Sequence, residues 1–315
     1  MISRTLLRRA MSLPVLLVLV TIAAFSLTLL LPGNAADAVA GENASAEQVA
    51  AARQTLRLDD PVPTRYAAWL GDVVRGDFGD SVVTHRPIGA EIARRLPITL
   101  SIGIFALLFA VVGGTLIGVV QALFANRWID RVLLAIVSAF LSIPNFWLAT
   151  MLVGIFAVQL RWLPAIGYTA FGDSPTEWFR HIILPVITLS LFPMAEVARQ
   201  IRTGLIGVLD KDYIRAARAR GIAPNRVISK HAMKNAAGPA LTIVGLRVGY
   251  LFAGSVIVER IFNLPGLGAY ALQAIQTRDV PAIQSIVLIS ALIVIVTGLV
   301  VDLTYSYLNP KVRIS

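Results

Sequence analysis

Long hydrophobic runs without charge constrain this chain more than any other feature. Residues 13–31, 98–125 and 132–160 contain no Asp, Glu, Lys or Arg. A helix needs about 20 apolar residues to cross the hydrocarbon core of a bilayer, so each run is long enough to span one. Charged residues make up 15% of the chain, whereas a soluble domain carries about 25%. Lipid must therefore cover part of the protein, and the expected structure is an all-α polytopic membrane protein.

Three further segments bring the number of predicted spans to six. Residues 182–195 are too few to cross alone, but the apolar pattern continues through charged positions to about Leu205. Residues 240–258 carry one charge, at Arg247, and residues 283–301 carry none before Asp302. We therefore predict one domain, residues 1–315, with spans at 13–31, 98–124, 132–158, 182–205, 240–258 and 283–302.

Basic residues predict the orientation of these spans. An even number of spans places both termini on one side, and the early Arg4, Arg8 and Arg9 indicate the cytoplasm. The predicted cytoplasmic loop 206–238 holds seven Lys or Arg, whereas the outside loops 161–181 and 259–282 hold two each. All four lysines of the chain fall on the predicted cytoplasmic side: Lys211, Lys230, Lys234 and Lys311. The net charge of +10 therefore indicates contact with anionic lipid and no nucleic-acid partner.

One sizeable segment, residues 32–97, is predicted to lie outside the membrane. The apolar run before it is 19 residues long, which exceeds the about 7–15 residues of a signal-peptide core, so we interpret it as a retained span. Residues 64–74 place Tyr66 and Trp69 on one helical face, which we expect to lie in the membrane interface.

Several kinds of chemistry are excluded by composition and motifs. The chain has no cysteine, which removes disulfides and thiolate sites, and its three histidines lie far apart without metal-site spacing. It also has no phosphate-binding GxxxxGK[ST] loop with which to hold ATP. We predict no catalytic residue, no metal and no cofactor on this chain.

A short basic helix is expected in the cytoplasmic loop, from Asp212 to about Gly221. Ala216 and Ala217 are small enough to let a helix approach a groove closely. Gly221 can adopt a left-handed conformation and end the helix, and Pro224 enforces the turn. The segment is either a short rigid helix that transmits motion between subunits or a basic surface helix that lies on lipid headgroups.

Charged residues within the fourth and fifth spans form a second candidate site. Glu196, Arg199 and Arg202 share one side of the fourth span, and Arg247 lies within the fifth. A charge in hydrocarbon is costly, so such residues usually face protein or water. Glu196, Arg199 and Arg247 could line a polar pathway or a seam with another subunit. The alternative is an internal Glu196–Arg199 pair, with Arg202 reaching the cytoplasmic interface.

Short motifs occur in a fixed order along the chain: Leu58-Asp-Asp-Pro61, Gly76-Asp-Phe-Gly79-Asp-Ser81, Arg95-Leu-Pro97, Leu141-Ser-Ile-Pro144-Asn-Phe-Trp147, Trp162-Leu-Pro164, Pro265-Gly-Leu-Gly268, Asp302-Leu-Thr-Tyr305 and Asn309-Pro310. In their order and spacing they resemble the dipeptide/oligopeptide class of binding-protein-dependent ABC importer permeases. Two unlike permeases pair in that class, and this chain resembles the one with the larger first outside loop. Arg215 departs from the Glu that often precedes the Ala-Ala pair in ABC permeases.

This resemblance implies a type I importer permease fold in the prokaryotic plasma membrane. It implies four partners: a second homologous permease, two ATPase subunits that hold Mg-ATP, and an extracytoplasmic substrate-binding protein. Coupling to the ATPase would fall to Asp212, Ala216, Ala217 and Gly221. An outside loop or gate would include Pro265, Gly266 and Gly268.

The function implied by the resemblance is import of short peptides by alternating access, with hydrolysis on partner subunits and no enzyme activity here. The same machine carrying nickel, glutathione or another small solute is an alternative. An ion-gradient secondary transporter is an alternative from another class, but it leaves the basic Ala-Ala loop unexplained.

Overall fold

The computed structural model describes residues 14–27, 45–55 and 59–308, although side chains are described only in part at 45–55 and not beyond residue 300. In these ranges the chain is helical without a strand, and its only β feature is a bridge between Asp80 and Pro87. The first described helix, Pro14–Leu27, lies in the first predicted span, whose residues 13 and 28–31 fall outside the described part. Two short helices follow, α3 (Ala46–Thr55) and α4 (Val62–Val74).

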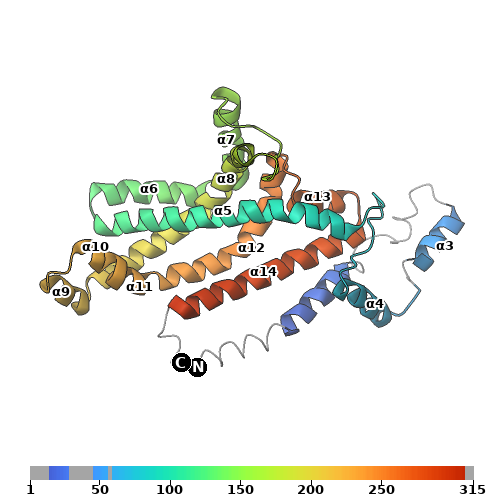
Figure 1. Ribbon diagram of the computed structural model, residues 1–315, viewed down its shortest axis with the longest axis horizontal. Helices are drawn as coiled ribbons and strands as arrows, with labels where there is room; N and C mark the ends of the chain where they lie inside the picture. Colours follow the sequence, from blue (N-terminus) through green and yellow to red (C-terminus); the bar gives the residue numbers. More distant parts are fainter. Residues whose placement is uncertain (1–13, 28–44, 56–58, 309–315) are drawn as a thin grey trace. The chain divides into compact units, whose positions relative to one another are not determined.

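Long helices occupy four of the other predicted spans, and a bent pair of helices occupies the third (Figure 1). Four are long and apolar enough to cross a membrane, and a bent pair brings the number to five. The helix Pro14–Leu27 is shorter. Six spans are consistent with this arrangement. The four long helices are α5 (Ile88–Leu123), α8 (Pro175–Leu209), α12 (Gly238–Ile261) and α14 (Val280–Leu308).

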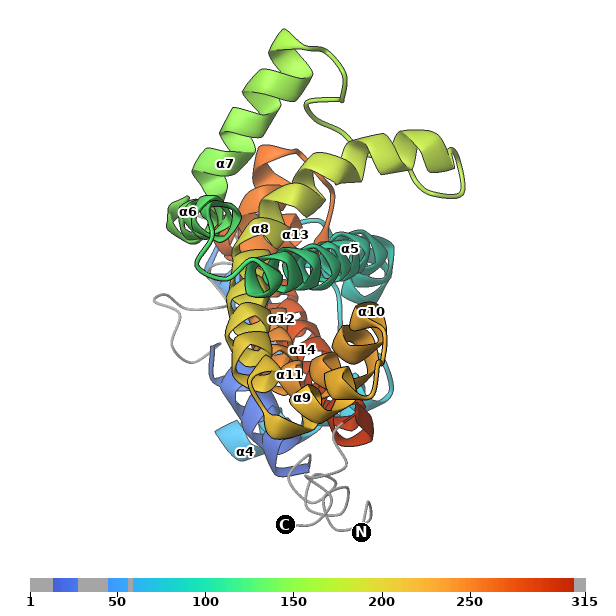
Figure 2. The same cartoon turned by 90° about the vertical axis from the view of Figure 1, so that its left-hand side faces the viewer.

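The third predicted span, residues 132–158, is not one straight helix, and whether its two parts cross as one span stays a prediction. It consists of α6 (Trp128–Ser142), α7 (Asn145–Leu152) and the π-helix η1 (Val153–Gln159), with a bend of 105° between α6 and the rest. Pro144 disfavours helical geometry at the residue before it. Ile143 accordingly has an extended ψ of 122° and ends α6. Figure 2 shows α7 leaving the bundle at this bend.

Two compact units emerge from the contacts within the chain. The first contains Thr99–Leu264 and the helix from Val294, and the second contains the chain up to Ile98 together with Pro265–Ile293. These units rest on contacts alone, so the prediction of a single domain for residues 1–315 stays a prediction.

Helix α8 forms the core of the first unit, where it packs most extensively on α12 and then on α6. Its contact with α5 is close because α5 presents glycines there. A Cβ atom added to Gly114 would lie 2.6 Å from the carbonyl oxygen of Met194, and one added to Gly118 would lie 2.5 Å from that of Ala198. The GxxxG spacing of α5 therefore serves close helix packing, as it commonly does in membranes.

The predicted cytoplasmic loop 206–238 is largely helical. After α8 come α9 (Asp212–Ala219), α10 (Pro224–Arg226), the π-helix η2 (Val227–Ala232) and α11 (Met233–Ala236). Figure 1 shows α9, α10 and α11 gathered at one end of α8 and α12. The loop is thus a folded cap on the first unit.

The second unit is held by aromatic and aliphatic contacts. Tyr66 and Trp69 of α4 pack on Phe25, with ring centroids 5.5 and 5.8 Å from the Phe25 ring. The aromatic face of residues 64–74 is therefore engaged by the helix Pro14–Leu27. A separate buried hydrophobic cluster joins the start of α5 to α13 (Leu267–Gln276) and α14. Its members include Ile88, Ile92, Leu267, Tyr270, Ala282 and Ile286.

Candidate functional site

Helix α9 presents one face to the protein and the other to solvent. Ile214 and Ala217 are buried, whereas Asp212, Arg215 and Ala216 are exposed. This division follows from the sequence, because residues three apart on a helix share a face. Of the four residues predicted to couple to an ATPase, Asp212 and Ala216 are therefore on the surface, and Ala217 anchors the helix.

Gly221 ends α9 in the way that the sequence predicts. Its φ of +73° lies in the left-handed region. The Gly221 N–H donates to the carbonyl of Arg218 at 2.9 Å, and the Ile222 N–H donates to that of Ala217 at 3.3 Å. These two bonds form a Schellman motif, which needs a left-handed residue at the position of Gly221. The glycine thus gives α9 a fixed end.

The support beneath α9 is tightly packed. Ile214 and Ala217 belong to one buried cluster with Leu205 of α8 and Val227 of η2. Tyr213 accepts a hydrogen bond from Asn235 Nδ2 of α11 at 3.0 Å. At Gly204, an added Cβ would lie 2.6 Å from a backbone carbonyl of α11. Helix α9 is therefore packed against the end of α8, against η2 and against α11.

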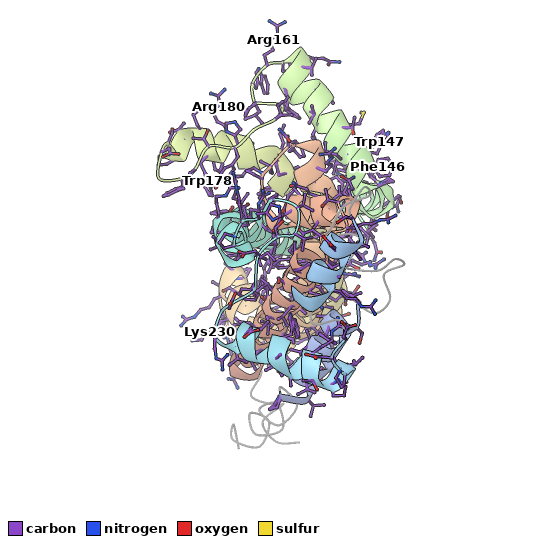
Figure 3. The ribbon with its side chains drawn as sticks, turned by 90° about the vertical axis from the view of Figure 1, so that its right-hand side faces the viewer. Phe146, Trp147, Arg161, Trp178, Arg180 and Lys230 are labelled. Atoms are coloured by element: carbon purple, nitrogen blue, oxygen red, sulfur yellow. The ribbon has the colours of Figure 1, made fainter. Side chains whose placement is uncertain are left out.

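The exposed surface of this cap is strongly basic. Asp212 is the acidic residue of α9, and its carboxylate lies 3.4 Å from Arg215 with both side chains largely exposed. Lys230 of η2, which Figure 3 labels, is also exposed. The cap can therefore contact acidic groups on a partner or a lipid surface. Its other exposed basic residues are Lys211, Arg218, Arg220, Arg226 and Lys234.

An ion pair joins the fourth and fifth predicted spans. Arg247 of α12 donates from Nε and Nη2 to the two carboxylate oxygens of Glu196 in α8. Its guanidinium also lies over the rings of Phe192 and Tyr250, 5.3 and 5.7 Å from their centroids. Glu196 is buried, but the Arg247 side chain keeps 32% of its surface exposed. The pair therefore brings together two of the three predicted pathway residues.

Arg199, the third predicted pathway residue, is exposed on α8 and does not join this pair. The alternative of a Glu196–Arg199 pair was wrong, because the buried carboxylate of Glu196 faces α12. Arg202 does not simply extend towards an interface either. It makes a bidentate pair with Asp130 of α6 at 2.7 and 2.8 Å, and the Asn126 N–H donates to the same carboxylate.

The residues predicted to form an outside loop or gate lie at the start of α13 in the second unit. Gly266 caps the start of α13 and Gly268 is buried in its first turn, whereas Pro265 is exposed. The far end of α13 is fixed by Asp279, which accepts hydrogen bonds from the hydroxyl of Ser81 and the N–H of Val82. These hydrogen bonds therefore attach the α13 segment to the turn before α5.

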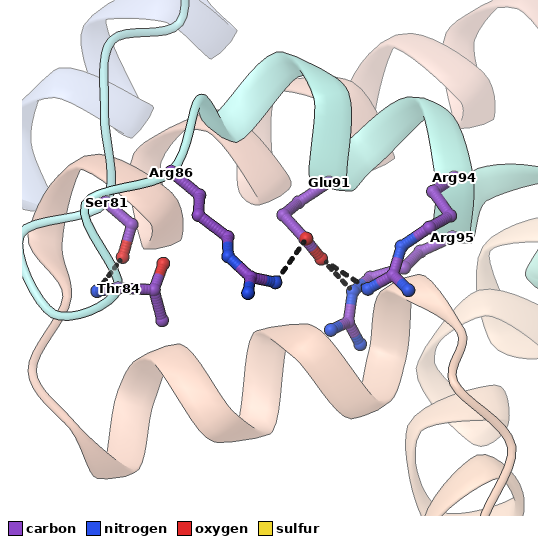
Figure 4. A network of polar contacts seen from close by, with 6 residues as sticks. All are labelled: Ser81, Thr84, Arg86, Glu91, Arg94 and Arg95. Carbon is purple, nitrogen blue, oxygen red and sulfur yellow. Dashed lines mark hydrogen bonds and ion pairs between the residues drawn. The ribbon is translucent and has the colours of Figure 1, made fainter.

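Three arginines surround one carboxylate at the start of α5 (Figure 4). Glu91 accepts from Arg94 and Arg95, both at 2.9 Å, and Arg86 lies 3.9 Å away. Arg95 also stacks on Tyr270 of α13, 4.8 Å from the ring centroid. Burial raises the pKa of Tyr270, and the charges of Asp279 and Glu91 act in the same direction. These contacts fix α13 against α5.

Sequence reasoning missed several partners of the charged residues. Tyr250 follows Arg247 by three positions and Phe192 precedes Glu196 by four, so helical spacing could have placed each aromatic ring beside its charge. Asn145 donates from Nδ2 to the Tyr250 hydroxyl at 3.2 Å. Its signal was a polar residue directly after Pro144 within an apolar run. Asp130 gave the weaker signal of a carboxylate at the start of a span.

Comparison with known sequences identifies one family over most of the chain. Residues 114–314 match the family described as binding-protein-dependent transport system inner membrane component. Residues 1–103 match the N-terminal model of the same transport system membrane component.

Two curated relatives cover nearly the whole chain. The dipeptide transport system permease protein of Alkalihalophilus pseudofirmus is 39% identical over 326 residues, covering 97% of this chain and 98% of that protein. The glutathione transport system permease protein of Salmonella choleraesuis is 39% identical over 307 residues, covering 98% of each.

Solved structures agree on the fold. An inward-facing structure of the MetNI methionine ABC transporter matches with a TM-score of 0.56 and 18% identity, covering 69% of this chain and 96% of that chain. An amino acid ABC transporter crystallised with histidines matches with a TM-score of 0.51 and 18% identity, covering 69% and 94%. At this identity the likeness concerns the fold alone.

Proposed function

The chain belongs to the family of binding-protein-dependent transport system inner membrane components, and we propose that it imports short peptides as one permease of an unlike pair. Family membership makes it a membrane permease subunit of an ABC transporter, which is not itself an enzyme and works in a complex. The observation that carries the cargo is 39% identity over nearly the full length to a permease named for dipeptide transport.

Glutathione is the second candidate cargo, because an equally similar relative is named for its transport. Glutathione is itself a tripeptide, so the two candidates share a zwitterionic backbone with free carboxylates. Nickel or another small solute remains an alternative that no residue of this chain favours.

Coupling is proposed to occur at α9, with Asp212 and Ala216 facing the ATPase and Ala217 and Gly221 setting the pose of the helix. The packed cap supports this proposal, since it leaves the exposed face of α9 little freedom to move independently of α8. Closure of two ATPase subunits around Mg-ATP would push α9 and reorient α8 and its neighbours, which is alternating access. An ion-gradient transporter would have no use for such a cap.

The remaining parts of the proposed machine follow from this assignment. The Glu196–Arg247 pair borders the pathway or the seam with the second permease, and Arg199 faces the same seam from the exposed side of α8. The α13 segment, which begins with Pro265, Gly266 and Gly268, contributes to the outside gate. A substrate-binding protein delivers cargo at that gate, in the prokaryotic plasma membrane, with both termini in the cytoplasm.

Reconstitution in liposomes with the second permease, the ATPases and the binding protein tests the proposal. Vanadate, which traps ABC ATPases, should block peptide accumulation, and collapse of ion gradients should leave it unchanged. Uptake that resisted vanadate and stopped with the gradient would identify a secondary transporter. ATP-dependent uptake of nickel without peptide uptake would overturn the cargo only.

A further inference from the structure

Arg247 keeps part of its guanidinium free although it is already paired. Nε and Nη2 donate to Glu196. Over the part of the chain that the structure describes, Nη1 donates to no acceptor. Because 32% of the side chain is exposed, an external anion can reach Arg247 while its pair with Glu196 is formed.

The neighbouring residues hold this free edge in one place. Phe192 and Tyr250 stack on each other, with centroids 5.1 Å apart and planes 29° apart, and the guanidinium lies against both rings. Tyr250 is in turn fixed by the hydrogen bond from Asn145. A group held by an ion pair, two rings and a supporting hydrogen bond is preorganised for binding.

The chemistry of a guanidinium edge selects a carboxylate. Arginine presents planar N–H donors that match a carboxylate in two parallel hydrogen bonds. The phosphate of a lipid headgroup is a poor candidate, because Arg247 is the tenth residue of the 24 in α12 and therefore lies about 14 Å along the helix from its nearer end. An anion that reaches this depth must come through the protein.

Pairing with Glu196 also sets how strongly Arg247 would hold an external carboxylate. An isolated arginine in a low-dielectric region would hold a carboxylate tightly, which would stop transport. Conduction requires binding strong enough for entry and weak enough for release. Because Glu196 neutralises the guanidinium, the free edge offers hydrogen-bond geometry with little net charge.

We propose that Arg247 is a transient binding site for the carboxylate of the passing cargo, an inference that rests on the proposed import of peptides. Its free edge receives the C-terminal carboxylate of a peptide. Glu196, Phe192 and Tyr250 position the guanidinium, and Asn145 positions Tyr250. The site accordingly favours peptides with a free C-terminus over those with a C-terminal amide.

The test compares uptake of trialanine with uptake of its C-terminal amide in proteoliposomes that contain the complete transporter. Both peptides are supplied at saturating concentration with the same binding protein, so its own preference cancels when variants are compared. The variants are Glu196→Gln/Arg247→Gln, which avoids leaving a buried charge unpaired, and Arg247→Lys. Lysine retains the charge for Glu196 but has no second planar edge. Arg260→Gln, on the same helix, controls for loss of an arginine.

We expect the ratio of acid to amide uptake to fall about three- to tenfold in both variants, as loss of one hydrogen bond of ordinary strength predicts, and to stay unchanged in Arg260→Gln. An unchanged ratio in Arg247→Lys, with both peptides still carried, would overturn the carboxylate site alone. If the double variant fails to assemble, Arg247→Lys alone tests the carboxylate site. A wild-type transporter that hydrolyses ATP but carries neither peptide would overturn both the peptide cargo and this inference.

Discussion

Glycines decide local structure at two kinds of position in this protein. At Gly118 the requirement is space, because a Cβ atom would lie 2.5 Å from the carbonyl oxygen of Ala198 on the neighbouring helix. At Gly221 the requirement is backbone conformation, since φ is +73° and nothing lies within 4 Å of an added Cβ. Substitution of glycine is therefore unfavourable at both positions, but for different physical reasons.

Replacing Gly118 with Ala should destabilise the protein by about 1–3 kcal/mol, because two packed helices must separate to admit the methyl group. Gly103→Ala on the same helix is the matched control, since an added Cβ there meets nothing within 4 Å. Thermal unfolding in detergent should show a lower midpoint for Gly118→Ala only. Equal midpoints for the two variants would contradict the close contact between α5 and α8.

Replacing Gly221 with Val should weaken assembly with the ATPase and slow transport while leaving membrane insertion intact. A side chain in the left-handed region costs about 1–2 kcal/mol, and a β-branched one suffers most. Gly221→Asn is the control, because Asn tolerates this conformation. Co-purification of the ATPase and peptide uptake are the measurements. Normal values for the Val variant would count against α9 as the coupling helix.

Among the helices, α6 and α8 are joined by a buried ion pair at the end of α8 near the cap. Asp130 is almost fully buried and Arg202 keeps 20% of its side chain exposed. Removing one partner of such a pair strands the other charge, whereas removing both is often nearly neutral.

The variant Arg202→Met should therefore lose about 3–5 kcal/mol of stability. The double variant Asp130→Asn/Arg202→Met should recover much of that loss, because no charge remains unpaired. A double-mutant cycle by chemical unfolding measures the coupling. If Arg202→Met unfolded at the same denaturant concentration as the wild type, Arg202 would be better described as a surface arginine.

Taken as a whole, the molecule is predicted to cross the membrane six times with both ends inside. The absence of native cysteine lets single cysteines report on each side. A cysteine at Ser45 should react with an impermeant thiol reagent in intact cells, and one at Asn126 should not. Both positions are exposed in the structure, so a difference in reactivity would report the membrane side. The reverse pattern would refute the orientation.

The sequence by itself predicted where this chain forms apolar helices and where α9 ends. Uncharged runs predicted the positions of the spans, because the length of such a run alone decides whether a helix can cross hydrocarbon. The end of α9 was equally local, since Gly221 and Pro224 act through their own backbone geometry. These properties depend on neighbours along the chain, which a sequence displays directly.

Only the tertiary structure decided which charges meet. Glu196 pairs with Arg247, 51 residues away, and Arg202 with Asp130, 72 residues away. Periodicity placed Glu196, Arg199 and Arg202 on one side of a helix and suggested a local pair, but burial of Glu196 against α12 outweighed that proximity. The bend after α6 was also not predicted. Apart from Pro144, the uncharged run 132–160 continues through the bend without a break in its apolar pattern. Such pairings are set by how helices pack, and packing depends on residues distant in sequence.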